Sequence, residues 1–312
     1  MNIFNDIKCA CDLALAKKGI KGNTYLLPGG LGVFLLECPQ DHLRTLCELP
    51  FIEYNFSKVQ SIDFSLLDKQ KVISICLPRN STIPFTQLEG FSLNRVAVRD
   101  SKAVDFKSLE NLPLEILELS GAKLNDLGFC ASLPLKRLII PHTEVENLGP
   151  LYGKQITHLD ILKTRVSDLS PLQNMPIEEI NISGTSISDL EPICFAKKLK
   201  KLEIRGTQIE DLTPLLDCPI ESVILPGSKV SSIECLAYLP IKNLNIIGLE
   251  INDLSMLSTL PLQSLSLSPE LLSKKQYQFL KELQIPTLRG PGDEENQNME
   301  DFFLKHQKDL EL

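Results

Sequence analysis

The chain has 312 residues, of which 43% are hydrophobic and 23% are charged, with a formal net charge of −8 and a pI near 5.2. This acidic balance and the absence of a basic stripe argue against nucleic acid as a partner. No run of 18 apolar residues occurs, so we expect no membrane span. Nine scattered cysteines without the spacing of a disulfide framework favour a cytoplasmic location.

The first segment, MNIFNDIKCACDLALAKKG, is predicted to form an amphipathic helix. Its apolar side consists of Ile3, Phe4, Ile7, Cys11 and Leu15. It is not a typical signal peptide, because charged residues interrupt its apolar stretch. We therefore interpret residues 1–50 as an N-terminal helical cap. Residues from about Gly30 onward can be threaded as a degenerate repeat, although LPGGLG interrupts the pattern.

Residues 51–268 repeat a unit of about 21 residues eleven times, with a single step of 22 between Ile177 and Leu199. Apolar residues fall at the first residue of each unit, which we call the origin, and three, five, ten and thirteen residues after it. The origins are Phe51, Val72, Leu93, Leu114, Leu135, Ile156, Ile177, Leu199, Ile220, Ile241 and Leu262. Apolar residues at the origin, three and five predict a short parallel strand with one buried face.

The other regular positions predict the chain's return from one strand to the next. Gly recurs at position seven, where we expect a backbone with positive φ, and Thr or Ser follows at position eight to satisfy backbone groups by its hydroxyl. Asp at position twelve, as in Asp211, is expected to be the N-cap of a helical or 3₁₀ turn that tolerates a proline such as Pro214.

The unit L-x-x-L-x-L-x-G-T-x-I-x-D-L-x-P-L, seen for example in KKLEIRGTQIEDLTPL, resembles the short leucine-rich repeat of bacterial proteins, including the repeat tails of some bacterial serine/threonine kinases. The resemblance implies an α/β fold: a right-handed solenoid with a parallel β-sheet on its concave face, short 3₁₀, helical or extended return legs, and helical caps at both ends. It also implies a protein that binds other proteins, usually through the concave sheet.

After the repeats, residues 269–289 are predicted to form a C-terminal cap of a helix, over 269–283, and a strand. Residues 290–312 are predicted to be an acidic tail with a short helix. Its apolar residues, Phe302, Phe303 and Leu304, are expected to dock on the C-terminal cap or on a partner.

Signals for chemistry are weak, and each has a structural interpretation that we favour. PGGLG at 28–32 lacks the Lys-Ser/Thr of a phosphate-binding loop, and no kinase catalytic motif is present. Cys9-x-Cys11 has no second pair for zinc, and His158 and Asp160 have no nucleophile beside them. We therefore expect no catalytic residue, no cofactor and no metal.

The solvent-facing strand positions are one, two, four and six, and they form the surface that we call the strand face. Position one alternates in charge between neighbouring strands, as in Glu178, Lys200 and Glu221, which cross-strand pairing explains without a ligand. The remaining positions predict a partner-binding surface, with the arginines as its main contributors because they have fewer opposite charges in their own columns, although Glu118 lies close enough to compensate partly. Its residues are Arg95, Arg99, Glu118, Arg137, His158 and Asp160.

The sequence thus favours a monomeric, non-enzymatic adaptor or regulator that binds an unidentified protein partner. Two alternatives stay open: an enzyme or sensor whose site uses residues 1–50, and a structural assembly component. The flanks of the repeats compete with the strand face as the binding surface, because three aromatic residues lie on the return legs: Tyr152, Phe195 and Tyr238.

Overall fold

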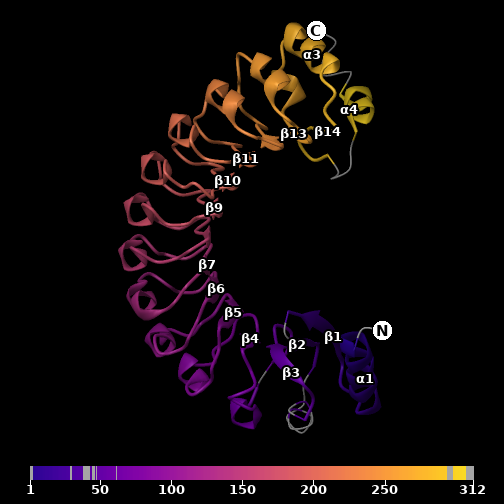
Figure 1. The fold of residues 1–312 in the computed structure, drawn as a ribbon, viewed down its shortest axis with the longest axis vertical. Coiled ribbons are helices and arrows are strands. Elements are labelled where there is room, and N and C mark those ends of the chain that lie inside the picture. Colours follow the sequence, from indigo (N-terminus) through magenta and orange to yellow (C-terminus); the bar gives the residue numbers. More distant parts are fainter. Residues whose placement is uncertain are drawn as a thin grey trace. The chain divides into compact units, whose positions relative to one another are not determined.

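The computed structural model describes residues 3–28, 30–37, 43, 46, 48–60, 62–293 and 298–306. The chain divides into two compact units, Met1–Val145 and Glu146–Leu312. In each unit the strands stack side by side along one side of the ribbon, and the 3₁₀ turns lie along the other side (Figure 1).

The first unit begins with helix α1 (Ile3–Lys17) and then forms a sheet of seven strands in chain order. Strands β1 and β2 pair in antiparallel fashion, and the parallel pairing starts between β2 and β3. The strands are β1 (Gly22–Leu27), β2 (Gly30–Leu35), β3 (Phe51–Asn55), β4 (Ser74–Cys76), β5 (Arg95–Arg99), β6 (Ile116–Ser120) and β7 (Arg137–Ile139).

The second unit continues the same pattern with seven parallel strands and two helices, α3 (Lys274–Glu282) and α4 (Met299–Lys305). Its strands are β8 (His158–Asp160), β9 (Glu179–Asn181), β10 (Lys201–Glu203), β11 (Ser222–Ile224), β12 (Asn243–Asn245), β13 (Ser264–Ser266) and β14 (Thr287–Arg289).

A 3₁₀ turn lies on most return legs, as the sequence predicts. In the four turns from η5 to η8 a proline occupies one of the first two positions, where its missing N–H costs nothing. The turns are η1 (Phe64–Leu66), η2 (Phe85–Leu88), η3 (Phe106–Leu109), η4 (Gly128–Ser132), η5 (Gly149–Leu151), η6 (Ser170–Leu172), η7 (Glu191–Ile193), η8 (Thr213–Leu215), η9 (Glu234–Tyr238), η10 (Ser255–Thr259) and η11 (Pro269–Leu271).

The apolar frame of the repeat is the core. All 33 residues at the origin, three and five of the eleven units are buried. The strand register keeps equivalent positions in line, so that Leu202 lies opposite Val223, and Val223 lies opposite Leu244. Each unit therefore stacks its apolar residues on those of its neighbours, as expected for a solenoid.

From the third to the tenth repeat unit, position seven has a left-handed backbone even where the residue is not glycine. Gly206 has a φ of 63°, but His142 and Lys163 occupy the same position with φ values of 58° and 53°. A side chain is disfavoured in this conformation, so the packing of the neighbouring units must impose it. The bend is thus a property of the repeat, and glycine only makes it less costly.

The residue at position eight closes this bend with its hydroxyl. In Thr143, Thr164, Thr185 and Thr207 the Oγ1 donates to the carbonyl three residues earlier, at distances from 2.6 to 2.8 Å. Ser228 occupies the same position, but its buried Oγ has no hydrogen-bond partner. Four of these five hydroxyls therefore act as the sequence predicts.

We expect Thr207→Val to lower the free energy of unfolding by about 1 kcal/mol, because the carbonyl of Ile204 would lose a buried hydrogen bond. Ser228→Ala is the matched control and should be nearly neutral, since its hydroxyl has no partner. Urea unfolding of both variants measures the difference. Equal effects would contradict a role for the threonine hydroxyl.

The aspartate at position twelve caps the turn as predicted in the first repeat unit, where Asp63 is the N-cap of η1 and accepts the N–H of Ser65, but not in the later repeat units from η6 onward. The N-cap of η8 is Leu212, and Asp211 lies one residue earlier, where its Oδ1 accepts the N–H of Thr213 at 2.8 Å. Asp168 and Asp253 do the same for Ser170 and Ser255. The carboxylate thus accepts the N–H of the residue two positions later, which makes an Asx turn and satisfies the first N–H of the 3₁₀ turn.

These hydrogen bonds make the folded chain sensitive to acid. Hydrogen bonds from the hydroxyl and N–H of Ser170 lower the pKa of Asp168, and those from the hydroxyl and N–H of Thr213 lower the pKa of Asp211. In the same way, hydrogen bonds from the N–H and hydroxyl of Ser255 lower the pKa of Asp253. A carboxyl that is more acidic in the folded state favours folding above its unfolded pKa, about 4, and this contribution disappears as the pH falls through the folded-state value.

We therefore expect the triple variant D168N/D211N/D253N to lose less stability than the wild type between pH 6 and pH 3, because the amide oxygen keeps the Asx turn and carries no charge. Urea unfolding at the two pH values measures the difference. An unchanged pH dependence in the variant would contradict the assignment.

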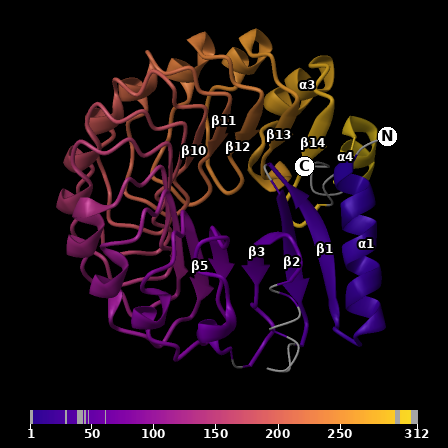
Figure 2. The same ribbon diagram turned by 60° about the horizontal axis from the view of Figure 1, so that its bottom comes forward.

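The N-terminal end of the first unit contains an antiparallel hairpin that the sequence analysis does not predict. Figure 2 shows α1 beside β1, at the edge of the sheet. Cys11 and Leu15 of the predicted apolar side are buried, whereas Ile7 is 37% exposed. The Oγ1 of Thr24 in β1 donates to the Oδ1 of Asp12 at 2.5 Å and so ties the helix to the hairpin.

The C-terminal end of the second unit is covered by two helices. The helix predicted over 269–283 is divided, because η11 comes first and α3 begins only after Ser273. Ser273 and Gln276 form a capping box, in which each side chain bonds the backbone N–H of the other residue. Of the tail, α4 packs against β14 and buries Phe302 fully, while residues 294–297 and 307–312 lie outside the described residues.

We expect Phe302→Ala to release α4, because this ring is its fully buried anchor and contacts Phe303 and His306. Limited proteolysis should cleave the tail several-fold faster than in the wild type. Leu304→Ala is the control, since Leu304 is 75% exposed on the same helix. Equal protection of the two variants would contradict the docking.

Within the described residues, no helix is long and apolar enough to cross a membrane. The seven described cysteines are all free thiols.

Candidate functional site: a hollow in the strand face of the first unit

The strand face of the first unit contains a hollow of about 510 Å³, which we call the strand-face hollow. Strands β3 to β7 and the residues that follow β3 and β4 contribute to it. Its lining residues are Asn55, Ser57, Lys58, Cys76, Leu77, Arg79, Arg95, Ala97, Val98, Arg99, Glu118, Ser120 and Ile139. Four of these are basic and one is acidic, in a chain whose overall balance is acidic.

Arg95 lies at the centre of a chain of polar contacts that crosses the sheet. Its Nη2 lies 3.1 Å from the Oε1 of Glu118 on β6, and its Nη1 lies 3.4 Å from the Oε2 of Glu53 on β3. The same Nη1 donates to the Oγ of Ser74 on β4 at 3.4 Å. On the far side, the Oη of Tyr25 on β1 donates to the Oε1 of Glu53 at 2.5 Å.

This network fixes the protonation states around Arg95. Burial disfavours the charge on Arg95, but Glu118 and Glu53 outweigh burial and raise its pKa, so the guanidinium stays charged. Burial, followed by the hydrogen bond to Glu53, raises the pKa of Tyr25, which keeps its hydroxyl protonated as a donor. Burial raises the pKa of Cys76 to about 11, so this thiol is a poor nucleophile.

The other basic residues of the hollow differ in whether a carboxylate pairs with their charge. The Nε of Arg79 lies 2.7 Å from the Oδ2 of Asp100 in an exposed ion pair. Arg99 on β5 and Lys58 after β3 make no ion pair within the described part of the chain. The amide of Asn55 uses its oxygen to accept the N–H of Ser57. The hollow therefore presents positive charge at Arg99 and Lys58.

The structure brings together three of the six residues that the sequence predicts for partner binding. Arg95, Arg99 and Glu118 line the strand-face hollow. Arg137 lies on β7, and Ile116 separates it from Arg95 in the strand register. The contact of Arg95 with Glu118 on β6 agrees with the expectation that Glu118 compensates the arginines in part. The expectation that Arg95 has few opposite charges in its own column is wrong, because Glu53 of that column, on β3, pairs with it.

The other two predicted residues lie on β8 in the second unit and have local contacts. The Oδ1 of Asp160 accepts the N–H of Leu162 at 3.0 Å, in an Asx turn like those on the return legs. The Nδ1 of His158 lies 2.8 Å from the Oγ1 of Thr157, and its Nε2 lies 3.7 Å from the Oε1 of Glu179. Asp160 thus has a structural role beside any contact with a partner.

The first column of the strand face forms ion pairs in part. Lys136 pairs with Glu115, and Lys242 pairs with Glu221, both at 2.8 Å. Lys200, which the sequence places between Glu178 and Glu221, acts on Glu221 only through its charge and forms no ion pair within the described residues. Cross-strand pairing therefore explains two of these lysines directly.

Sequence reasoning missed three residues of the site, namely Tyr25, Glu53 and Lys58. Glu53 occupies position two of the first repeat, the same column as Arg95, so extending that column to the first repeat would have found it. Tyr25 belongs to the unpredicted hairpin. It lies opposite Gly32, where a Cβ would overlap the Tyr25 ring, so the glycine gives the tyrosine its place over β2.

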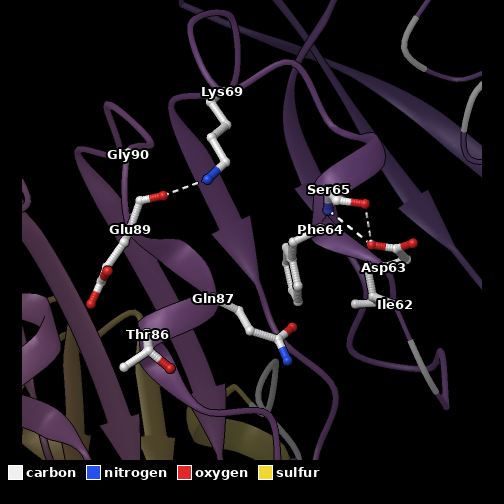
Figure 3. A pocket seen from close by; sticks show the side chains of 9 residues that line it. All are labelled: Ile62, Asp63, Phe64, Ser65, Lys69, Thr86, Gln87, Glu89 and Gly90. Carbon is white, nitrogen blue, oxygen red and sulfur yellow. Dashed lines mark hydrogen bonds between the residues drawn. The ribbon is translucent and has the colours of Figure 1, made fainter.

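A second hollow of about 820 Å³ lies on the opposite side of the first unit, beside η1 and η2 (Figure 3). The Nζ of Lys69 donates to the backbone carbonyl of Glu89 at 2.6 Å, and the Oδ1 of Asp63 accepts from the N–H and hydroxyl of Ser65. The lining residues of this second hollow include one base, Lys69, against the four bases of the strand-face hollow.

The flanks of the second unit expose three aromatic side chains on the return legs. Tyr152, Phe195 and Tyr238 are 74%, 60% and 85% exposed. Among the described residues, no group of three or more His, Cys, Asp or Glu side chains is placed to hold a metal ion.

Parallel strands in constant register, joined by 3₁₀ turns and built on a 21-residue apolar frame, define a leucine-rich-repeat solenoid. Solved structures support this class of fold. An internalin (InlF) from Listeria monocytogenes matches with a TM-score of 0.54 and 16% identity, over 80% of this chain and 86% of that chain.

The chain also matches the TLR13–ssRNA13 complex, with a TM-score of 0.51 and 17% identity, over 72% of this chain and 40% of that chain. Internalin C2 of Listeria monocytogenes matches with a TM-score of 0.46 and 20% identity, over 74% of this chain and 94% of that chain. Neither a family model nor a curated protein matches the sequence. At these identities the likeness concerns the fold alone.

Proposed function

We propose that this chain is a non-enzymatic protein-binding module, an adaptor or regulator that binds a protein partner through the strand face of its first unit. The observation that carries the proposal is the strand-face hollow, where Arg99 and Lys58 have no ion pair in the described part of the chain. Arginine is enriched among the residues that dominate protein interfaces, because its planar guanidinium binds carboxylates in a bidentate manner.

The network around Arg95 supports this assignment of roles. Arg95 is bound on two sides by carboxylates, so it shapes the hollow and holds the strands in place. Arg99 projects from the same strand without a partner of its own in the described residues and is available to a ligand. Arg137 extends the basic surface to β7 and belongs to the same proposed interface.

The groups around the hollow do not favour an enzyme. The thiol of Cys76 is protonated at neutral pH, and the Tyr25 hydroxyl is held as a donor to Glu53. Neither of these two groups is therefore activated as a nucleophile or a base in the way that catalysis requires.

The test is capture of partners from the lysate of the source cell with the full chain. The double variant R99A/R137A should lose a partner that the wild type retains, while the flank variant Y152S/Y238S should keep it. Circular dichroism and thermal unfolding check that each variant is folded. A partner that R99A/R137A retains and Y152S/Y238S loses would place the interface on the flank and overturn the proposal.

A further inference from the structure

The strand-face hollow lies beside a second depression of about 420 Å³, and the two share Ser57, Lys58 and Arg79 as lining residues. The second depression is formed by the segments that follow β3 and β4, from Ser57 to Gln60 and from Pro78 to Ile83. The shared residues place the two depressions next to each other at the ends of β3 and β4, and we call the pair the β3–β4 groove.

The charges of the groove identify the ligand it suits. Its bases are Lys58, Arg79, Arg95 and Arg99, and the carboxylates paired with them are Glu53, Glu118 and Asp100. The net charge of these seven groups is one positive charge, because Lys58 and Arg99 contribute two and the two carboxylates around Arg95 exceed its charge by one. Residues 1–145 carry 16 bases and 16 acids, so the whole net charge of −8 falls on residues 146–312. An acidic ligand therefore meets no net repulsion from the first unit.

The uncharged lining adds hydrogen-bond donors and apolar surface. The Nδ2 of Asn55 and the hydroxyl of Ser120 face no partner within the described residues and can donate to an anion. Pro78, Val59 and Ile83 supply an apolar wall. No aromatic side chain lines either depression, so the groove has nothing on which nucleic-acid bases could stack.

We infer that the β3–β4 groove binds an extended peptide segment of a partner protein and that Arg99 and Lys58 hold an oxyanion of that segment. The oxyanion is a glutamate or aspartate carboxylate, or the phosphate of a phosphoserine. This inference rests on the proposed function and names the chemistry of the partner. Two adjacent depressions suit a chain of several residues better than a single free ion, and charge-assisted hydrogen bonds from arginine give the segment its anchor.

The test uses the full chain and four fluorescein-labelled probes of equal length at low salt. They are a glutamate-rich peptide, its phosphoserine counterpart, a lysine-rich peptide and an oligouridylate. Fluorescence anisotropy should show binding of the first two probes only, and the tighter of them identifies the source of the oxyanion. The variant K58A/R99A should weaken this binding about tenfold. The control K107A/K123A removes two exposed lysines of the same unit outside the groove and should bind like the wild type.

Thermal unfolding should be the same for K58A/R99A and the wild type, because neither side chain has an ion pair to lose within the described residues. Equal peptide affinities for K58A/R99A and the wild type would overturn the inference, and so would tighter binding of the oligouridylate. If neither acidic peptide binds while a captured protein still requires Arg99 and Arg137, the groove inference fails and the proposed function stands.

Discussion

A fragment that lacks residues 1–50 is expected to aggregate instead of folding as a soluble monomer. The reason is the interior that these residues cover. Phe51, Tyr54 and Phe56 of the first repeat are each no more than 2% exposed. The rings of Tyr54 and Phe56 stack at 5.7 Å, and Phe56 continues the cluster to Phe64.

The fragment would lose the backbone pairing of β3 with β2 and the apolar side chains that cover the interior at the N-terminal end of the stack. Strand β2 pairs along β3 from Leu31 to Phe34, and Leu31, Val33 and Leu35 are buried. Without β2, the edge of β3 presents unpaired backbone groups beside a fresh apolar surface, which is a template for association with other chains. Terminal caps of solenoids are required for solubility for the same reason.

Size-exclusion chromatography with light scattering and urea unfolding of the fragment 51–312 give the answer. A chain that lacks only residues 307–312 is the matched control for truncation at the other end and should remain a soluble monomer. A soluble, monomeric 51–312 fragment that unfolds cooperatively would show that the stack does not need its N-terminal end.

The repeat made the fold predictable because it supplies the same information eleven times. The apolar frame identifies strand, bend and turn, and each later unit confirms the frame of the first, so even His142 and Lys163 at the bend do not obscure it. Outside the repeat this redundancy is absent. The segment YLLPGGLGVFLL fits the frame only as a degenerate repeat from about Gly30, with LPGGLG interrupting it, and the β1–β2 hairpin was therefore missed.

The site was less predictable than the fold, for a geometric reason. Columns on the strand face show which residues are neighbours in register, but a long side chain reaches beyond its own column. The guanidinium of Arg95 reaches Glu118 in position four of the next strand, and it also reaches past β4 to Glu53 of its own column. Sequence spacing therefore placed Arg95 on the surface with Glu118 near it, but it missed the pairing with Glu53.

Substitution of the two arginines of β5 is expected to change the stability by very different amounts, although the residues are four apart on one strand. Arg95→Ala should lower the free energy of unfolding by about 2 kcal/mol, because the nearly buried carboxylate of Glu53 would lose its ion pair and keep the hydrogen bond from the Tyr25 hydroxyl. Arg99→Ala should change it by less than about 0.5 kcal/mol, because its exposed side chain has no ion pair in the described part of the chain.

A double-mutant cycle separates the network from a general effect of removing an arginine. Glu53→Gln keeps the size of the side chain and removes its charge, so in the E53Q background the loss caused by Arg95→Ala should shrink by about 1 kcal/mol or more. The loss caused by Arg99→Ala should not change in that background. Urea unfolding of the six chains provides these values. If Arg95→Ala proves as mild as Arg99→Ala, the contacts to Glu53 and Glu118 do not stabilise the sheet, and Arg95 returns to the set of residues available to a partner.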